Sequence, residues 1–276
     1  MTFIITLIAL VVERFFDWSH LRQWRWYNGY QAFLDHRIGG KSSYIFLLIA
    51  ILPPVFLVGI ISYMSGGFLS GGFKLVFGLV VLLYCLGPAN FWAQAFSRIA
   101  DFHKDDPNIA LQNLNKDFGI GVVSDSQTLH LSFTRGILLA GYYRIFAVVF
   151  WLAVLGPMGA VLYRMVYLCV SNANAATSSS ALRLRQMLDW IPVRIFTFLF
   201  ALGGHFTEVF NRWKALAKKG IDANEELITD CGMAALNVMK DGSIPENSNA
   251  EKEAIALLDR VFIITLFVLA VVVVLT

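Results

Sequence analysis

Long apolar runs broken by few charges are the feature that most constrains how this chain can fold. Hydrophobic residues make up 57% of the 276 residues and charged residues 15%, whereas soluble domains carry about 45–50% and about 25%. A soluble domain of this length could not hide so much apolar surface, because even large domains leave roughly a quarter of the chain's surface exposed. Lipid as the solvent removes the conflict. The sequence therefore predicts an all-α polytopic membrane protein, with four to six transmembrane helices plus amphipathic cytoplasmic helices.

The apolar runs predict six helices, over about residues 1–16, 44–64, 74–96, 142–170, 190–204 and 261–276. The first is short for a bilayer span of about 20 residues. Pro53 and Pro54 lie in the middle of the second and are expected to kink it, because proline removes a backbone donor. Gly87-Pro88 and Gly156-Pro157 interrupt the third and fourth helices. Each break can be either a kink or a re-entrant turn.

We interpret residues 1–276 as a single integral membrane domain with polar connections at about 17–43, 97–141 and 205–260. The small-residue stretch at 171–180 (SNANAATSSS) is typical of a flexible linker. In the last connection, Asp222 or Asn224 could cap an amphipathic helix. One face of that helix is apolar and is expected to pack on the protein rather than lie on the bilayer; its residues are Leu227, Cys231, Ala234, Ala235 and Val238.

Basic residues predict the orientation of the chain. The three polar connections carry four, four and seven Lys or Arg residues, whereas the opposite side has little beyond Lys74, Arg183 and Arg185. By the positive-inside rule, the basic connections face the cytoplasm and both termini face outward. No Lys/Arg stripe alternates with aromatic residues, so nucleic acid is not an expected partner. The expected partners are membrane lipid and an unknown protein bound at the cytoplasmic connections.

Familiar catalytic motifs are absent from the sequence. It has no nucleotide-binding loop of the Walker type, no His-Glu-x-x-His and no Gly-x-Ser-x-Gly. The three cysteines suggest neither a disulfide framework nor a metal site. A patch formed by Asp101, His103, Asp105 and Asp106 could chelate a divalent cation, but such loop residues are usually solvated. We therefore predict no catalytic residue, no metal and no cofactor.

Ionisable residues next to apolar runs are the best candidates for function, because a charge at mid-membrane costs about 2.5–3.5 kcal/mol. Arg144 and Arg164 lie near the two ends of the fourth helix, and Arg194 lies just inside the fifth. The short link between these helices predicts that Arg164, Asp189 and Arg194 cluster at one membrane level. The cluster would either lock two helices together or bind a small anionic ligand, since arginine donates two parallel hydrogen bonds to phosphate or carboxylate. Glu13 with Arg14 is a second candidate; adjacent helical residues do not face each other, so each needs its own partner.

Two motifs resemble those of the AmpE family of bacterial membrane proteins. They are LGPMGAVLYR at Leu155–Arg164 and LDWIPVR at Leu188–Arg194, and the apolar start ending at Glu13-Arg14-Phe15 resembles an AmpE start. The resemblance implies a multi-pass protein of the bacterial inner membrane, a sensor or signalling modulator linked by name to β-lactamase induction. The residues that carry the structural motif are Gly156, Pro157, Gly159, Trp190 and Pro192.

The AmpE family is similar in turn to the CobD/CbiB family, the adenosylcobinamide-phosphate synthases. That family has a Glu-Ser-x-x-Glu-Asn signature before the Gly-Pro-x-Gly-Ala motif. The corresponding stretch here, Thr134–Arg144 (TRGILLAGYYR), contains no acid, although Arg135 matches the family's upstream arginine. Amide synthesis coupled to ATP needs metal-bound phosphate and a positioned acid–base group. The resemblance thus supports the fold and argues against the synthase reaction.

Three functional hypotheses follow. The first is a non-enzymatic regulatory or scaffold protein whose cytoplasmic connections bind a partner or ligand. The second is a diverged enzyme that binds a phosphorylated or nucleotide ligand, with candidate ligand-binding residues Arg135, Arg144, Tyr163, Arg164, Asp189 and Arg194. The third is a transporter, which broken helices favour, although no inverted halves are visible in the sequence.

Overall fold

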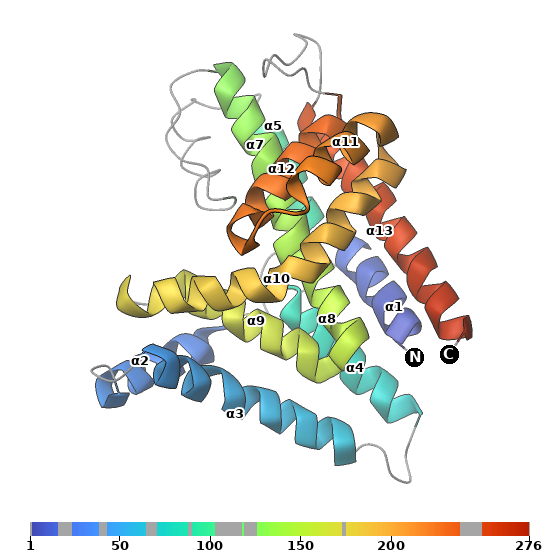
Figure 1. Cartoon of the computed structure of the whole chain (residues 1–276). Helices are drawn as coiled ribbons and strands as arrows, with labels where there is room; N and C mark the ends of the chain where they lie inside the picture. Colours follow the sequence, from blue (N-terminus) through green and yellow to red (C-terminus); the bar gives the residue numbers. More distant parts are fainter. Residues whose placement is uncertain are drawn as a thin grey trace. The chain divides into compact units, whose positions relative to one another are not determined.

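The structure is a computed structural model that describes residues 2–15, 24–38, 43–64, 71–87, 90–102, 118, 126–172, 175–237 and 250–275. Within these ranges the chain is helical and contains no β-strand, which confirms the all-α prediction (Figure 1). The helices form two compact units. Unit 1 comprises Met1–Asn90, Ala147–Asp189 and Leu269–Thr276, and unit 2 comprises Phe91–Phe146 and Trp190–Val268. The interpretation of residues 1–276 as one domain stays a prediction.

Among the described residues, four helical segments are long and apolar enough to cross a membrane: Tyr44–Met64, Thr128–Leu155, Ser178–Gly203 and Ala250–Leu275. Large apolar side chains are exposed along the first of them, including Phe56, Ile60 and Tyr63. Such a surface is stable in lipid and costly in water. The predicted membrane protein with several spanning helices is thus confirmed. The first helix, α1 (Thr2–Phe15), has 14 residues and extends about 21 Å, less than the bilayer core of about 30 Å.

Unit 1 is built around close helix contacts made at glycines. Its helices are α1, α2 (Arg25–Ile38), α3 (Ser43–Met64), α4 (Gly72–Cys85), α8 (Ala147–Leu155), α9 (Pro157–Asn172) and the first part of α10 (Ala175–Gly203). A Cβ atom at Gly78 would lie 2.7 Å from Cδ1 of Ile5, so α4 and α1 touch there. A Cβ atom at Gly59 would lie 2.9 Å from Sδ of Met158, so α3 and α9 touch as well.

The Gly156-Pro157 break reverses the chain. Gly156 has a φ of +68° between α8 and α9, and a Cβ atom at Gly159 would overlap the carbonyl oxygen of Trp151. In a continuous helix these two residues, eight positions apart, would be separated by about 12 Å along the axis. The break predicted in the fourth helix is therefore present, and it is a reversal of the chain rather than a kink. The segment forms a pair of helices, α8 and α9, that fold back on each other because glycine permits the left-handed turn.

Two predicted helix boundaries are wrong. Most of the expected linker at 171–180 is helical, because α9 continues to Asn172 and α10 starts at Ala175 rather than near Trp190. Alanine is the best helix former and serine is tolerated, so this composition does not break a helix that packs on its neighbours. Similarly, the last helix, α13 (Ala250–Leu275), starts before the apolar tail, at Ala250 rather than Val261.

Unit 2 has an aromatic core. It contains α5 (Phe91–Phe102), α7 (Ser126–Gly141), a π-helical turn at Tyr142–Phe146, the second part of α10, α11 (Phe206–Leu216), a 3₁₀ turn at Ile221–Ala223, α12 (Asn224–Ala235) and most of α13. The ring of Phe196 on α10 lies 5.3 Å from that of Tyr142 and 4.7 Å from those of Phe146 and Phe200.

The segment predicted as the third helix forms two helices, since α4 ends at Cys85 and α5 starts at Phe91.

Helix α12 confirms the amphipathic prediction in part. Leu227, Cys231 and Ala235 are buried, so the apolar face packs on the protein as expected. The predicted cap is wrong, because Ala223 occupies the N-cap position and makes no side-chain cap hydrogen bond. Val238 and the acidic patch residues His103, Asp105 and Asp106 lie outside the described residues, as does the side chain of Asp101.

Candidate functional site

The two motif segments meet in unit 1 through a buried polar network. Tyr163 on α9 donates a hydrogen bond from Oη to Oδ1 of Asp189 on α10, at 2.8 Å. Arg185, one helical turn before Asp189, places Nε 3.8 Å from the other carboxylate oxygen. Tyr163 and Asp189 are each 1% exposed and Arg185 is 9% exposed. Asp189 thus accepts a hydrogen bond and forms an ion pair in the interior of unit 1.

This network joins two helices at a considerable desolvation cost. Moving charged groups out of water costs several kcal/mol per ion, and mutual attraction repays this only with good geometry and additional hydrogen bonds. The phenol of Tyr163 supplies such a bond to Asp189. Sequence reasoning missed Arg185, although its spacing of four residues from Asp189 on a helix was the signal that could have found it.

Arg164 is also buried in unit 1, beside Gly87, the glycine of the Gly87-Pro88 break. It is 4% exposed, and its guanidinium lies 5.1 Å from the ring centroid of Tyr167. A Cβ atom at Gly87 would lie 2.9 Å from Nη2 of Arg164, and Gly87 has a φ of +113°. Glycine at this position therefore provides both the backbone conformation and the space that the guanidinium occupies.

Glu13 is buried at the end of α1, whereas its neighbour Arg14 is exposed. The amide of Asn90 donates a hydrogen bond to the backbone carbonyl of Glu13. Terminal helix carbonyls lack partners within the helix, so this bond satisfies one of them. The two adjacent charges point to different surroundings, as their helical spacing predicts.

Arg194 belongs to unit 2, where it binds backbone carbonyls. Its Nε donates to the carbonyl of Ala217 at 2.9 Å and its Nη2 to that of Lys219 at 2.8 Å. The guanidinium also lies 4.2 Å from the ring centroid of Trp190, and Nη1 donates to Oδ1 of Asn224 at 3.3 Å. Arg194 thus caps the C-terminal end of α11 and holds the turn that leads to α12.

The predicted site residues therefore fall in different environments. Tyr163 and Asp189 are in direct contact, and Arg164 lies in the same unit. Arg194 is in the other unit, so the grouping of all three ionisable residues stays a prediction. Arg144, in the π-helical turn, donates to Oε1 of Gln94 and lies 5.8 Å from the ring of Phe118, whereas Arg135 is exposed on α7.

Unit 2 contains further polar pairs that sequence reasoning did not find. Nδ1 of His130 on α7 lies 2.5 Å from Oε1 of Glu251 on α13, and Nε1 of Trp92 donates to Oδ1 of Asp259 at 2.7 Å. Both pairs join helices far apart in sequence, so no local pattern could have revealed them. Among the described residues, no group of three or more His, Cys, Asp or Glu side chains is arranged to hold a metal ion.

Comparison with known proteins identifies the family. The family model described as "Regulatory signalling modulator protein AmpE" matches residues 1–276. The chain belongs to the AmpE family. A curated relative, the "Cobalamin biosynthesis protein CobD" of Chromobacterium violaceum, is 29% identical over 114 residues, which cover 39% of this chain and 36% of the relative. The chain thus matches little more than a third of that relative's length, and no solved structure matches. Both predicted resemblances, to AmpE and distantly to CobD, are confirmed.

Proposed function

We propose that this AmpE-family protein is a non-enzymatic regulator in the bacterial inner membrane that couples the state of the cell envelope to β-lactamase induction. The observation that carries the proposal is the engagement of motif side chains with one another. Tyr163 bonds to Asp189, and Arg185 pairs with the same carboxylate, all within the interior of unit 1. A general acid or base must reach the proton that it transfers on a substrate, and Asp189 is instead enclosed by protein.

A buried network of this kind suits a switch. Packed interfaces with polar locks have discrete arrangements rather than continuous deformation, so a ligand or partner acts by favouring one arrangement. In this proposal, the Tyr163–Asp189 bond holds α9 against α10 in one state. A signal that separates these helices would release the bond.

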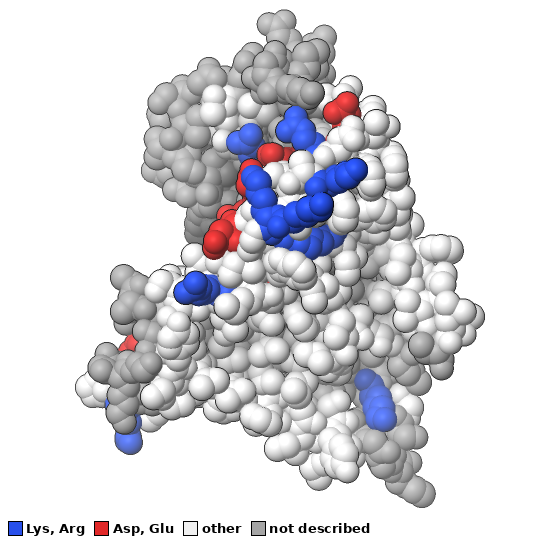
Figure 2. Space-filling view, in the orientation of Figure 1, with Lys and Arg blue, Asp and Glu red and all other residues white. Residues whose placement is uncertain are grey.

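The proposed cytoplasmic side carries the exposed basic surface of unit 2. Lysine and arginine side chains gather over α11 and the turn to α12 (Figure 2); they include Arg212, Lys214, Lys218 and Lys219. The positive-inside rule supports a cytoplasmic location for this surface, where an unidentified protein partner would bind. Cysteine placed at Lys218 should react with a membrane-impermeant maleimide in inverted vesicles and not in intact spheroplasts; the reverse pattern would refute this orientation.

A deletion strain tests the regulatory role. β-Lactamase activity would be measured after exposure to a β-lactam in cells that lack the gene and in cells that carry it again. We expect deletion to change the induction ratio, the wild-type gene to restore it, and Asp189→Ala to fail at equal protein levels in the membrane. Asp222→Ala, at an exposed position in unit 2, is the matched control and should restore induction. Unchanged induction in the deletion strain would end the proposal.

A diverged enzyme is the alternative, favoured by the similarity to CobD and by the buried Arg164. A thermal-shift screen of the detergent-purified protein against nucleotides, cobinamide-type corrinoids and muropeptides would test it. A ligand at a hundred times its dissociation constant stabilises a fold by about 2.7 kcal/mol. A shift that disappears in Arg164→Ala would establish a ligand pocket, and reproducible nucleotide turnover would overturn the non-enzymatic proposal.

A further inference from the structure

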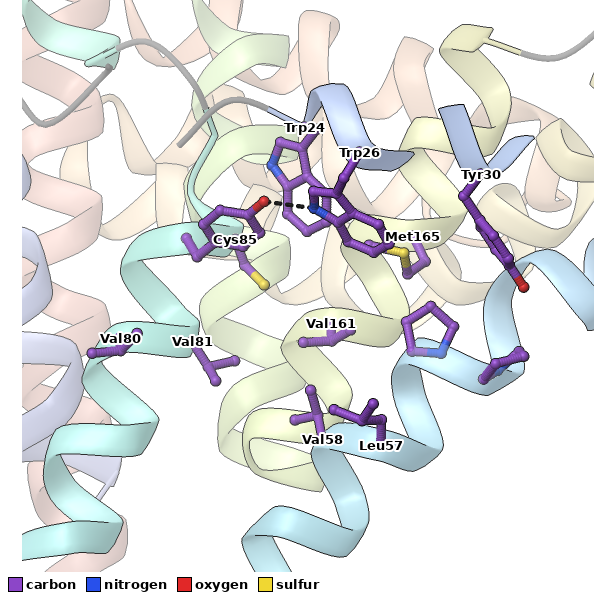
Figure 3. Close-up of a pocket in the computed structure, with 13 residues that line it drawn as sticks. Trp24, Trp26, Tyr30, Leu57, Val58, Val80, Val81, Cys85, Val161 and Met165 are labelled. Carbon is purple, nitrogen blue, oxygen red and sulfur yellow. Dashed lines mark hydrogen bonds between the residues drawn. The ribbon is translucent and has the colours of Figure 1, made fainter. Parts of the chain in front are cut away.

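Unit 1 contains an apolar cavity that none of the interactions above uses. It has a volume of about 420 Å³ and lies between α2, α3, α4 and α9 (Figure 3). Aromatic rings of Trp24, Trp26 and Tyr30 lie toward one end of it, and the aliphatic side chains of Leu57 and Val58 lie away from them. A cavity of this size falls within the range of small-molecule sites, about 300–1,000 Å³.

The walls of the cavity present almost no polar atoms that could bind water. Aliphatic side chains from α4 and α9 line it, including Val81, Val161 and Met165, together with Cys85. Apolar cavities stay dry and take up apolar molecules, because water needs two to four polar partners to enter. The occupant that these walls favour is therefore a hydrocarbon.

Two prolines of α3 line the cavity, and a hydrogen bond from α2 compensates for the backbone donor that Pro53 lacks. Pro53 has no N–H, so the carbonyl of Ile49, four residues earlier, loses its helical partner. Oη of Tyr30 donates to that carbonyl at 2.7 Å. The hydrogen bond satisfies the backbone oxygen from α2, and the rings of Pro53 and Pro54 then line the cavity. Because of this hydrogen bond, Pro53 can lie inside α3 without leaving the carbonyl of Ile49 unsatisfied.

The aromatic end has the character of a membrane interface. Nε1 of Trp26 donates to Oη of Tyr84 at 2.7 Å, and tryptophan and tyrosine collect where lipid tails meet head groups. The side chain of Trp24 is 7% exposed, and its Nε1 has no hydrogen-bond partner in the described part of the chain. A buried indole N–H usually has an acceptor, so an acceptor is expected at this end.

We propose that this cavity binds one acyl chain of a membrane phospholipid, with the lipid ester at the aromatic end. The chain would fill the aliphatic part, and an ester carbonyl would accept a hydrogen bond from Trp24. A phospholipid is the occupant because α3, which forms one wall, exposes large apolar side chains such as Phe56 and Ile60 on its outer surface and therefore lies among lipid tails. This inference does not depend on the regulatory function proposed above.

Photocrosslinking of the full-length protein tests the proposal. The probe is a phosphatidylethanolamine with a diazirine in one acyl chain, reconstituted with phosphatidylethanolamine and phosphatidylglycerol in liposomes. We expect peptide mass spectrometry to find label on the buried lining residues Val81 and Met165, which surrounding lipid does not reach. Label found only on exposed positions such as Ile60 would overturn the proposal.

A matched pair of variants on α4 sharpens the experiment. Val80 lines the cavity and is 58% exposed, whereas Val76, one turn earlier, is 57% exposed and is not part of the lining. Val80→Trp should obstruct the cavity and reduce label at Met165 severalfold while label at Ile60 is unchanged. Val76→Trp should leave both unchanged. Equal label at Met165 in the two variants, or displacement of the label by a free isoprenyl alcohol but not by excess phospholipid, would refute a phospholipid site.

Discussion

The two units of this protein use charged side chains in different ways. Unit 1 buries Glu13, Arg164, Arg185 and Asp189, and the last two pair with each other through side chains. Unit 2 leaves most of its charges at the surface, as in the ion pair of Lys219 with Glu226, in which both side chains are about half exposed. Its half-buried Arg194 binds backbone carbonyls instead.

The two units therefore differ in how much free energy of unfolding is lost when one member of a charged pair is removed. A buried charge whose partner is removed keeps its desolvation penalty and loses its compensation, at about 3–5 kcal/mol. An exposed pair is solvated by water when one member is lost, so its median contribution is only about 0–1 kcal/mol. We therefore expect substitutions at charged residues to be more destabilising in unit 1 than in unit 2.

Asp189→Ala should have the largest effect. It removes both the ion pair with Arg185 and the hydrogen bond from Tyr163, so we expect a loss of about 3–5 kcal/mol in the free energy of unfolding. Denaturant unfolding of the purified protein, followed by circular dichroism, would measure it. Asp222→Ala, at an exposed position, should change the same quantity by less than about 0.5 kcal/mol. Similar losses in both variants would remove the contrast between the units.

Arg194→Lys tests a polar anchor of unit 2. Lysine keeps the charge but lacks the planar fork that reaches the carbonyls of Ala217 and Lys219 together. We expect a loss of about 1.5–3 kcal/mol, the usual contribution of a hydrogen bond to a charged group. The turn after α11 should also open more often, which faster tryptic cleavage after Lys218 or Lys219 would reveal. Unchanged cleavage would show that the turn is held without Arg194.

Gly87→Ala and Gly156→Ala compare two positive-φ glycines. Each alanine must adopt a left-handed conformation, which costs about 1–2 kcal/mol. At Gly156 the Cβ atom meets open space, whereas at Gly87 it lies 2.9 Å from Nη2 of Arg164. We expect a larger drop in the thermal midpoint for Gly87→Ala, because the buried guanidinium must also move. A larger effect at Gly156 would contradict the role assigned to Gly87.

Cys231 on α12 should react slowly with alkylating reagents. Burial is the main cause that raises the pKa of its thiol to about 12, with a smaller contribution from Asp230, whereas the usual pKa is about 8.5. The folded state favours the neutral thiol. The contribution of Cys231 to the free energy of unfolding is therefore complete below about pH 8.5 and is lost as the pH rises toward 12. In a variant with alanine at the other two cysteines, iodoacetamide at pH 8 should modify Cys231 far more slowly than it modifies the unfolded chain.

Lys219→Ala should have the smallest effect. Its Nζ lies 2.8 Å from Oε1 of Glu226, but both side chains are about half exposed. We expect a change of less than about 1 kcal/mol that decreases with added salt, because exposed pairs are screened. A loss as large as that of Asp189→Ala, in the same unfolding measurement, would mean that surface pairs in unit 2 matter as much as buried ones in unit 1.

The sequence predicted part of the candidate site. Asp189 was found because an ionisable residue next to an apolar run is rare and costly, and Tyr163 was named with it as a candidate from the motif at Leu155–Arg164. The structure brings the two residues into contact. Arg185 was missed because it lies outside the expected helices, between the stretch interpreted as a linker at 171–180 and the apolar run expected to begin near Trp190. The partners of Arg194 could not be predicted, because backbone carbonyls 23 and 25 residues away leave no pattern in side-chain types.

By itself, the sequence determined that this is an all-α membrane protein of the AmpE family. The hydrophobicity of a segment and a sequence motif both depend only on residues that are close together in the sequence. Both can therefore be recognised before the tertiary structure is known. Only the tertiary structure decided that Gly156-Pro157 reverses the chain, that Arg194 caps α11 and that Tyr30 satisfies the carbonyl left free by Pro53. Each of these depends on which distant groups are close enough to bond, and that distance is set when the helices pack.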